Sequence, residues 1–189
     1  PELVLTELTA AHAKALATAE VRQRYPYRWQ RPHPVGAGLA VLSSVPFEEP
    51  TELPLWTPAL LVELELDGGP VHLVATNPVS PSDNYSIVRW QDDYDELVRV
   101  VGELGPDTVV AGDMNATTTH RRLRQLMSAG ELRDAQQVGG GGFRATWPVG
   151  AWAPPVLPLD HILVGPGLGI ERVLVLDDVG SDHFGVEAT

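Results

Sequence analysis

The sequence contains no cysteine, and Lys14 is the only lysine in its 189 residues. Without cysteine, the chain can form neither a disulfide framework nor a zinc–thiolate centre. It also contains no apolar run of membrane-spanning length and no pattern typical of a signal peptide. These absences exclude cysteine-based metal chemistry and leave the cellular compartment open.

Positive charge is also scarce. Lysine and arginine total 13 against 25 aspartate and glutamate residues, which gives a formal net charge of −12. A protein that binds many DNA phosphates usually carries a basic stripe, but only the short cluster of Arg121, Arg122 and Arg124 stands out here. The charge therefore argues against a long polyanion as the ligand, although a local patch could still bind one.

The composition is otherwise that of a globular protein, with 43% apolar residues. The length is enough for one domain with a full core, so we expect a single domain over residues 1–189. Because the chain begins with Pro1-Glu-Leu-Val-Leu and no methionine, we expect it to be truncated at its N-terminus.

Hydrophobic periodicity predicts a mixture of strands and helices. Strands are expected over residues 3–8, 38–43, 59–66 and 71–76, and the Asp67-Gly68-Gly69 turn should join the last two as a hairpin. Helices are expected over residues 10–24 and 87–104, and after caps at Thr117–Thr119. The proline- and aromatic-rich residues 26–36 are expected to form a loop.

The stretch Val109–Ala116 organises the candidate site. Two β-branched residues and a glycine precede Asp113 and Asn115, which are two positions apart. In an extended backbone, such residues point to the same face, so a carboxylate and an amide would lie side by side. That pair suits a Mg²⁺-bound water or a phosphate oxygen. The alternative is an Asx-type turn with no chemical role.

Three further polar groups border apolar strands. Glu7 closes the first strand, Asp160-His161 opens a late one, and Asp182-His183 precedes the last. Each alone has a structural explanation, as an edge glutamate or a satisfied structural histidine. Together they suggest phosphoryl transfer, in which a carboxylate orients a protonated histidine and others hold a divalent ion. A serine-nucleophile elbow (G-x-S-x-G) and an HExxH zinc motif are both absent.

In their order and separation, these motifs resemble the endonuclease/exonuclease/phosphatase superfamily. The resemblance rests on Glu7, Gly112-Asp113-Met114-Asn115, Leu159-Asp160-His161 and Ser181-Asp182-His183-Phe184. It implies an α/β fold, a four-layer αββα sandwich of two mostly antiparallel sheets. It further implies a metal-dependent hydrolase that uses Mg²⁺, with Mn²⁺ as the alternative ion.

The resemblance also implies roles for individual residues. Glu7 and Asp182 would be metal ligands, and His183 would act on the scissile phosphate. Asp113 would orient or deprotonate the attacking water, and Asn115 would contact the phosphate. Asp160 would orient His183.

Two departures from the family pattern stand out. The usual first strand, which carries an asparagine that supports the metal site, is missing, so the sheet would lack one strand unless the protein extends upstream. Asn77 stands where many members carry a histidine. Asparagine can hydrogen-bond a phosphate but cannot act as a general acid, so Asn77 is a candidate substrate contact.

Among family members, the chain is most similar to bacterial membrane-tethered proteins of the teicoplanin-resistance type. That similarity implies a polyprenyl pyrophosphate or other lipid-linked or small phosphate substrate. It also implies an extracytoplasmic location, with membrane proximity through an upstream segment. The aromatics Tyr25, Tyr27, Trp29, Trp147 and Trp152 could form an interfacial rim or simply pack in the interior.

Two other functions remain open. A Mg²⁺-dependent endo- or exonuclease would need a basic groove, for which the candidates are Arg22, Arg24, Arg28, Arg31, Arg121, Arg122 and Arg124. A degenerate, non-catalytic binding domain would explain the missing strand and Asn77. The number of carboxylates and amides retained argues against this last reading.

Overall fold

The larger sheet has six strands in the order β4-β5-β6-β7-β9-β8. They are β4 (Thr51–Glu52), β5 (Leu60–Leu66), β6 (Gly69–Ala75), β7 (Thr108–Asp113), β8 (Arg133–Asp134) and β9 (Asp160–Val164). The computed structural model describes residues 1–139, 144–150, 154–176 and 180–189. Within them, β6 and β7 pair in parallel, and the other pairings of this sheet are antiparallel.

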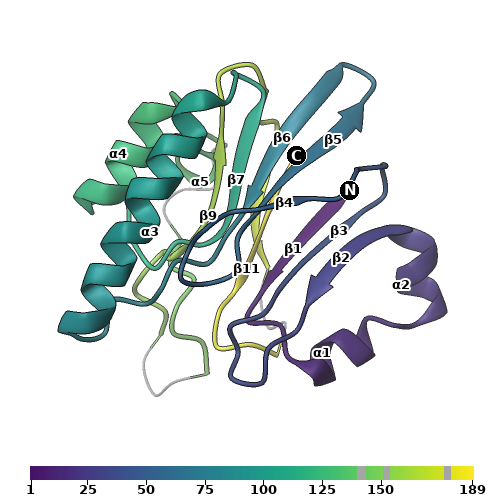
Figure 1. Cartoon of the computed structure of the whole chain (residues 1–189), viewed down its shortest axis with the longest axis horizontal. Helices are drawn as coiled ribbons and strands as arrows, with labels where there is room; N and C mark the ends of the chain where they lie inside the picture. Colours follow the sequence, from purple (N-terminus) through teal and green to yellow (C-terminus); the bar gives the residue numbers. More distant parts are fainter. Residues whose placement is uncertain (140–143, 151–153, 177–179) are drawn as a thin grey trace.

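A second layer of strands lies beside this sheet (Figure 1). β1 (Glu2–Thr6), β3 (Leu39–Ser43) and β2 (Tyr27–Arg31) pair antiparallel in the order β1-β3-β2. β10 (Val173–Leu176) and β11 (Gly185–Ala188) form an antiparallel pair of their own.

Helices cover the two outer faces (Figure 1). α3 (Asn84–Glu103), α4 (Arg121–Ala129) and the short α5 (Ala135–Val138) lie on the side of the six-stranded sheet. α1 (Ala10–Ala15) and α2 (Ala19–Arg24) lie beyond the three-stranded sheet. The predicted α/β sandwich with mostly antiparallel sheets is confirmed, whereas the missing first strand stays a prediction.

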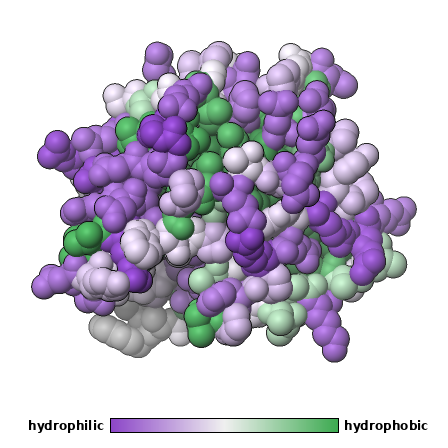
Figure 2. Space-filling view, in the orientation of Figure 1, coloured by the Kyte–Doolittle hydropathy of each residue, from purple (hydrophilic) through white to green (hydrophobic). Residues whose placement is uncertain are grey.

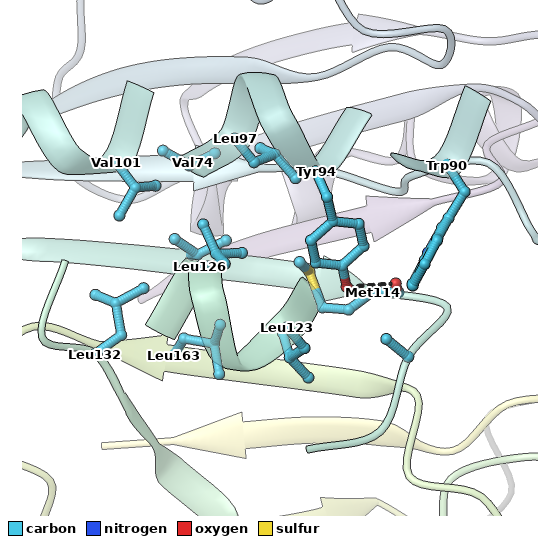
Figure 3. Close-up of a cluster of buried hydrophobic side chains, with 12 residues drawn as sticks. Val74, Trp90, Tyr94, Leu97, Val101, Met114, Leu123, Leu126, Leu132 and Leu163 are labelled. Carbon is cyan, nitrogen blue, oxygen red and sulfur yellow. Dashed lines mark hydrogen bonds between the residues drawn. The ribbon is translucent and has the colours of Figure 1, made fainter. Parts of the chain in front are cut away.

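Two of the buried clusters lie on either side of the larger sheet. Between the helices and the large sheet, Tyr94 and Leu97 of α3 pack against Leu123 and Leu126 of α4 and against Leu163 of β9 (Figure 3). Between the two sheets lie seven fully or nearly fully buried side chains, namely Leu39, Val41, Leu60, Val62, Leu64, Leu73 and Ala75. The outer surface in the view of Figure 1 is mostly hydrophilic (Figure 2).

Tyr94 also fixes the loop that follows β7. Its hydroxyl is buried and donates a hydrogen bond of 2.9 Å to the carbonyl oxygen of Met114 (Figure 3). Burial raises the pKa of Tyr94 well above its ordinary value, so it remains a donor. Helix α3 therefore positions the backbone between Asp113 and Asn115.

Several predicted elements need correction. The helix expected over residues 10–24 is split, because Leu16 ends α1 and the Thr18 side chain caps α2. The loop expected over residues 26–36 contains β2, which pairs with the fully buried β3. The predicted threonine caps do not cap α4, whose N-cap His120 makes no side-chain capping bond.

Among the described residues, no helix has both the length and the apolar composition that are needed to cross a membrane.

Candidate active site

The centre of the site is formed where β7 ends and β9 begins. These strands are antiparallel, and their register pairs Asp113 with Asp160. The last residue of one strand therefore lies directly beside the first residue of the other. Asp113 is buried, with only 4% of its surface exposed, whereas Asp160 is partly exposed. Two carboxylates 47 positions apart are brought together by strand pairing alone.

His183 lies between these two carboxylates. Its Nδ1 donates to Asp160 Oδ2 at 2.8 Å, and its Nε2 is 4.0 Å from Asp113 Oδ2. One ligand atom from each of the three residues lies within 4.8 Å of the others. The imidazole thus has one nitrogen fixed by a carboxylate and the other directed toward the second carboxylate.

Asp160 and His161 are neighbours in the sequence but do not act as a pair. Neighbouring strand residues point to opposite faces, and His161 is buried behind the sheet with Asp134, 2.6 Å away. Its Nε2 lies 2.9 Å from the carbonyl oxygen of Ala116 and 3.0 Å from that of Pro158. His161 is therefore a structural residue that ties together two loops at the site.

Asn115 reaches Asp113 through a turn and not along an extended strand, which corrects the expected geometry. Its φ of 46° is left-handed, and its backbone N–H donates to Asp113 Oδ1 at 2.8 Å. Its side-chain NH₂ donates to Asn77 Oδ1 at 3.2 Å and to the Pro78 carbonyl at 3.0 Å. Since both amide hydrogens are engaged, Asn115 presents its Oδ1 acceptor to the site.

Gly112 allows three chain segments to meet here. Its φ is 144°, and a Cβ at this position would lie 1.8 Å from the carbonyl oxygen of Thr76 and 3.5 Å from the Thr6 methyl group. Only glycine fits so close to another backbone. Because of this contact, the end of β1 lies beside the ends of β6 and β7, which places Glu7 next to the centre.

Glu7 and Asp182 stand at the edge of the centre and outside its tight group. Both are exposed, and Glu7 has a left-handed φ of 55°. The charge of Glu7 acts on Asp113, and the charge of Asp182 acts on His183. The Asp182 carbonyl accepts a 2.7 Å hydrogen bond from the N–H of Val149, which fixes the backbone just before His183.

The electrostatics of the centre favour a charged histidine. Burial alone would lower the pKa of His183, but the hydrogen bond and charge of Asp160, together with Asp113 and Asp182, raise it to about 9. Burial and the charge of Asp160 raise the pKa of Asp113 to about 7, against the lowering effect of the Asn115 N–H and His183. At neutral pH, the centre holds an imidazolium and a carboxyl group poised to gain or lose a proton.

The family assignment comes from a sequence model. The model of the endonuclease/exonuclease/phosphatase family matches residues 3–183, nearly the whole chain. The chain belongs to the endonuclease/exonuclease/phosphatase family. It is accordingly a metal-dependent hydrolase of phosphate esters, as the sequence predicted. No curated protein sequence matches the chain significantly.

Several solved structures are similar to this chain, and their names describe enzymes with different substrates. A 3'-5' exonuclease from Neisseria meningitidis is 20% identical, with a TM-score of 0.79 over 100% of this chain and 88% of that one. Sphingomyelinase C from Streptomyces griseocarneus is 17% identical, with a TM-score of 0.67 over 99% and 82%. A mannosyl-6-phosphatase from Bacteroides thetaiotaomicron VPI-5482 is 14% identical, with a TM-score of 0.68 over 100% and 84%. These likenesses establish the fold and leave the substrate open.

The residues present fit the divalent ion on which endonuclease/exonuclease/phosphatase enzymes depend. Asp113, Asp160, Glu7 and Asp182 supply several carboxylate oxygens, and one imidazolium offsets only part of their charge. Oxygen ligands of this kind are what Mg²⁺ and Mn²⁺ prefer. The raised pKa of Asp113 reflects the same excess of negative charge, which a bound cation would relieve.

Thr146 also positions the catalytic centre, and it was not predicted from the sequence. Thr146 is fully buried, and its hydroxyl accepts from the N–H groups of Leu159 and Asp160 at 3.0 and 3.3 Å. Its carbonyl accepts from the N–H of Phe184 at 2.9 Å. Thr146 thus connects the segments that carry Asp160 and His183. No local motif signals this role, because both partners are distant in the sequence.

The aromatic residues for which an interfacial rim and interior packing were the two alternatives do not share one location. The Trp147 ring lies 6.3 Å from that of His183, at the site. Tyr25 instead packs against the buried cluster under α1 and α2, whereas Tyr27 and Trp29 belong to β2. Trp152 lies outside the described residues.

Proposed function

We propose that this chain is a Mg²⁺-dependent phosphatase or phosphodiesterase that acts on a small or lipid-linked phosphate. The observation that carries the proposal is the His183 imidazole, held by Asp160 at 2.8 Å and directed at Asp113 4.0 Å away. A phosphate bound against these groups meets a cationic donor on one side and a carboxyl group on the other.

In the proposed reaction, water attacks phosphorus and the bond from phosphorus to the leaving-group oxygen breaks. In a pyrophosphate this is the phosphoanhydride bond, and the leaving group departs as a phosphate anion. Asp113, which faces His183 Nε2, orients the water and accepts its proton. His183 donates a hydrogen bond from Nε2 to a phosphate oxygen, and Asp160 keeps its ring in place. Glu7 and Asp182 would hold a divalent cation, which when bound would neutralise phosphate charge and polarise the attacking water.

The two asparagines have complementary roles in this proposal. Asn115 Oδ1, which accepts no hydrogen bond within the described part of the chain, faces a water or the cation. Asn77 uses its Oδ1 to accept from Asn115, so its NH₂ group is left to donate to a phosphate oxygen. Asn77 therefore binds the substrate without transferring a proton.

The distribution of arginines favours a small substrate over nucleic acid. The candidate basic residues are scattered. Arg22 and Arg24 lie on α2, two more lie on β2 and three lie on α4, and α2 and α4 are at opposite sides of the molecule (Figure 1). Arg31 pairs with Glu52, and Arg122 pairs with Asp95. The centre itself is lined by carboxylates, which repel a long polyanion.

A lipid-linked phosphate outside the cytoplasm is the specific substrate and location that we propose. The motivation is the similarity to membrane-tethered proteins of the teicoplanin-resistance type, together with Trp147 beside His183. Tryptophan suits the boundary between an apolar chain and a polar headgroup. A polyprenyl pyrophosphate combines these two parts.

The test measures phosphate release from farnesyl pyrophosphate and a water-soluble phosphomonoester, and strand cleavage of a short DNA duplex, with and without Mg²⁺. We expect release from the pyrophosphate that needs Mg²⁺ and is lost in His183→Ala. His72→Ala is the matched control, because this histidine lies on β6 and pairs with Glu63 at the surface. Hydrolysis of DNA in preference to both small substrates would contradict the proposal.

A further inference from the structure

Two loops meet beside the catalytic centre, at one end of the six-stranded sheet. One loop joins β4 to β5 and carries Thr57, and the other joins β6 to α3 and carries Asn77. The loops lie together because the register of the two strands pairs Leu60 with Ala75. The Thr57 hydroxyl donates a hydrogen bond to the carbonyl oxygen of Asn77. Each loop therefore helps to place the other.

Asp93 of α3 hydrogen-bonds both loops. It is only 1% exposed, and one of its oxygens accepts from the Trp56 N–H at 2.8 Å, whereas the other accepts from the Val79 N–H at 3.0 Å. Trp56 immediately precedes Thr57, and Val79 is two positions after Asn77. A single carboxylate therefore fixes the backbone of each loop close to the residue that contacts the other loop.

The second loop in turn holds the side chain of Asn115. The NH₂ group of Asn115 donates to Asn77 Oδ1 at 3.2 Å and to the Pro78 carbonyl oxygen at 3.0 Å. Pro78 immediately precedes Val79, so this acceptor lies one residue from the N–H that Asp93 binds. The contacts thus run without a break from Asp93 to the amide of Asn115.

The residue after Asp93 on α3 fixes the opposite side of the same asparagine. Tyr94 binds the carbonyl oxygen of Met114, which directly precedes Asn115. Two consecutive residues of α3 therefore anchor the backbone that carries Asn115 and the loop that holds its side chain.

Burial of the Asp93 carboxylate is costly, and packing alone does not require it. Within the described residues, no cation is paired with it, and burial raises its pKa against the lowering effect of the Val79 and Trp56 N–H groups. A carboxylate removed from water without a cationic partner is unfavourable. What it provides, and an apolar side chain could not, is two acceptor oxygens at one point.

We propose that Asp93 is a positioning residue of the active site, which holds Asn77 and Asn115 in the orientation that hydrolysis requires. This inference rests on the proposed function in one respect, because that function gives the two asparagines their contacts with the substrate, water or cation. Asp93 itself touches no reacting atom. Displacement of the two amides should lower turnover, because catalysis depends on the alignment of the groups that act in the transition state.

The first test follows the side-chain NH₂ resonances of Asn115 by ¹H–¹⁵N NMR in the full chain without substrate, and Asn115→Asp assigns them. Asp93→Asn is nearly isosteric but keeps only one acceptor oxygen, so one loop loses its anchor. We expect the Asn115 resonances to shift and to exchange faster with water. Asp95→Asn is the matched control, because it removes the same charge from an exposed residue of α3 that pairs with Arg122. Unchanged Asn115 resonances in Asp93→Asn would overturn the proposal.

Two further variants separate positioning from general stability. Thr57→Val removes the hydroxyl that binds the Asn77 carbonyl and leaves α3 intact, so it should shift the Asn115 resonances by a smaller amount. Val101→Ala lowers stability from a buried position of α3 about two turns beyond Asp93, and it should leave these resonances in place. Equal shifts in Val101→Ala and Asp93→Asn would contradict a specific role for Asp93.

Steady-state kinetics with Mg²⁺ then measure the effect on turnover of farnesyl pyrophosphate and a water-soluble phosphomonoester. Asp93→Asn should lower kcat roughly tenfold, which corresponds to the loss of about one hydrogen bond to a charged group, and Asp95→Asn should leave it unchanged. A kcat for Asp93→Asn equal to that of the parent protein would overturn the proposal. Absence of hydrolysis by the parent protein would instead defeat the proposed function, and the NMR result would still decide whether Asp93 positions the asparagines.

Discussion

The protonation state of His183 depends on a single carboxylate. Asp160 holds Nδ1 at 2.8 Å and, with the nearby acids, raises the pKa of His183 to about 9 against the opposing effect of burial. In metal-free protein, we expect the imidazole to stay protonated at neutral pH and to lose its proton near pH 9. Asp160→Asn should lower this pKa.

Imidazole NMR chemical shifts recorded against pH measure this directly. A His183 titration unchanged by Asp160→Asn would mean that the hydrogen bond does not control the charge.

A second residue-scale prediction concerns the linkage of metal and protons at Asp113. Burial and Asp160 raise the pKa of Asp113 to about 7, so part of the population is protonated at neutral pH. A cation favours the ionised form, so the apparent affinity for Mg²⁺ should rise between pH 6 and pH 8 with release of a proton. Calorimetry in two buffers of different ionisation enthalpy counts the protons. Asp113→Asn should remove most of this pH dependence.

A third prediction at the residue scale concerns the close contact of Gly112. Gly112→Ala should destabilise the protein by about 3 kcal/mol or more, since a Cβ would lie 1.8 Å from the Thr76 carbonyl at a φ of 144°. Urea denaturation measures the free energy of unfolding. Gly68→Ala is the control, because a Cβ there meets nothing within 4 Å. Equal effects of the two substitutions would contradict the close-contact explanation.

At the scale of elements, the buried pair of His161 and Asp134 joins β9 to β8. Removing one partner of such a pair leaves an uncompensated charge, so His161→Ala should cost about 3–5 kcal/mol. His72→Ala, which breaks a partly exposed pair with Glu63, should cost about 1 kcal/mol or less. Urea denaturation of both variants compares them.

This pair also has a pH signature. Burial lowers the pKa of His161, but the hydrogen bond and charge of Asp134 outweigh this effect and raise it. Because the folded pKa exceeds the unfolded one, the stabilisation is fully present below about pH 6.5 and is lost as pH rises through the folded pKa. His161→Ala should therefore lose more stability at pH 6 than at high pH.

The elements that the sequence predicted well are those with strong local patterns. The hairpin of β5 and β6 and helix α3 lie close to the expected ranges, because alternation and helical spacing determine them. β2 was missed because Pro26 and the aromatics around it resemble a loop, although β2 pairs with the strand that follows it, β3. The split after Leu16 was missed because alanine-rich residues favour helix on both sides.

The residues of the site likewise include some that the sequence predicted and some that it did not. The ordered motifs around Asp113, Asp160 and His183 were visible in the sequence because each borders an apolar strand. The family resemblance implied that Asp160 orients His183, and the two lie 2.8 Å apart, whereas the partner of His161, Asp134, was not visible. Those partnerships depend on strand faces and register, which only the folded chain defines.

At the scale of the whole molecule, the net charge of −12 should repel a soluble anionic substrate. Moderate salt screens this repulsion, so kcat/KM for a small phosphate ester should rise as NaCl is increased from low ionic strength. A nuclease that binds many phosphates would show the opposite dependence. Steady-state kinetics over a salt series distinguish a phosphoesterase of small substrates from a nuclease. A neutral crowding agent serves as the viscosity control.

The order in which the parts of the site occur along the chain has a consequence for protein synthesis. The six strands of the larger sheet are complete at Val164, but the centre needs His183, and β11 hydrogen-bonds only β10 among the described residues. A nascent chain can therefore form this sheet while it is still inert toward phosphate esters. Hydrolytic activity should therefore appear only after the segment that carries His183 has packed against Asp113 and Asp160.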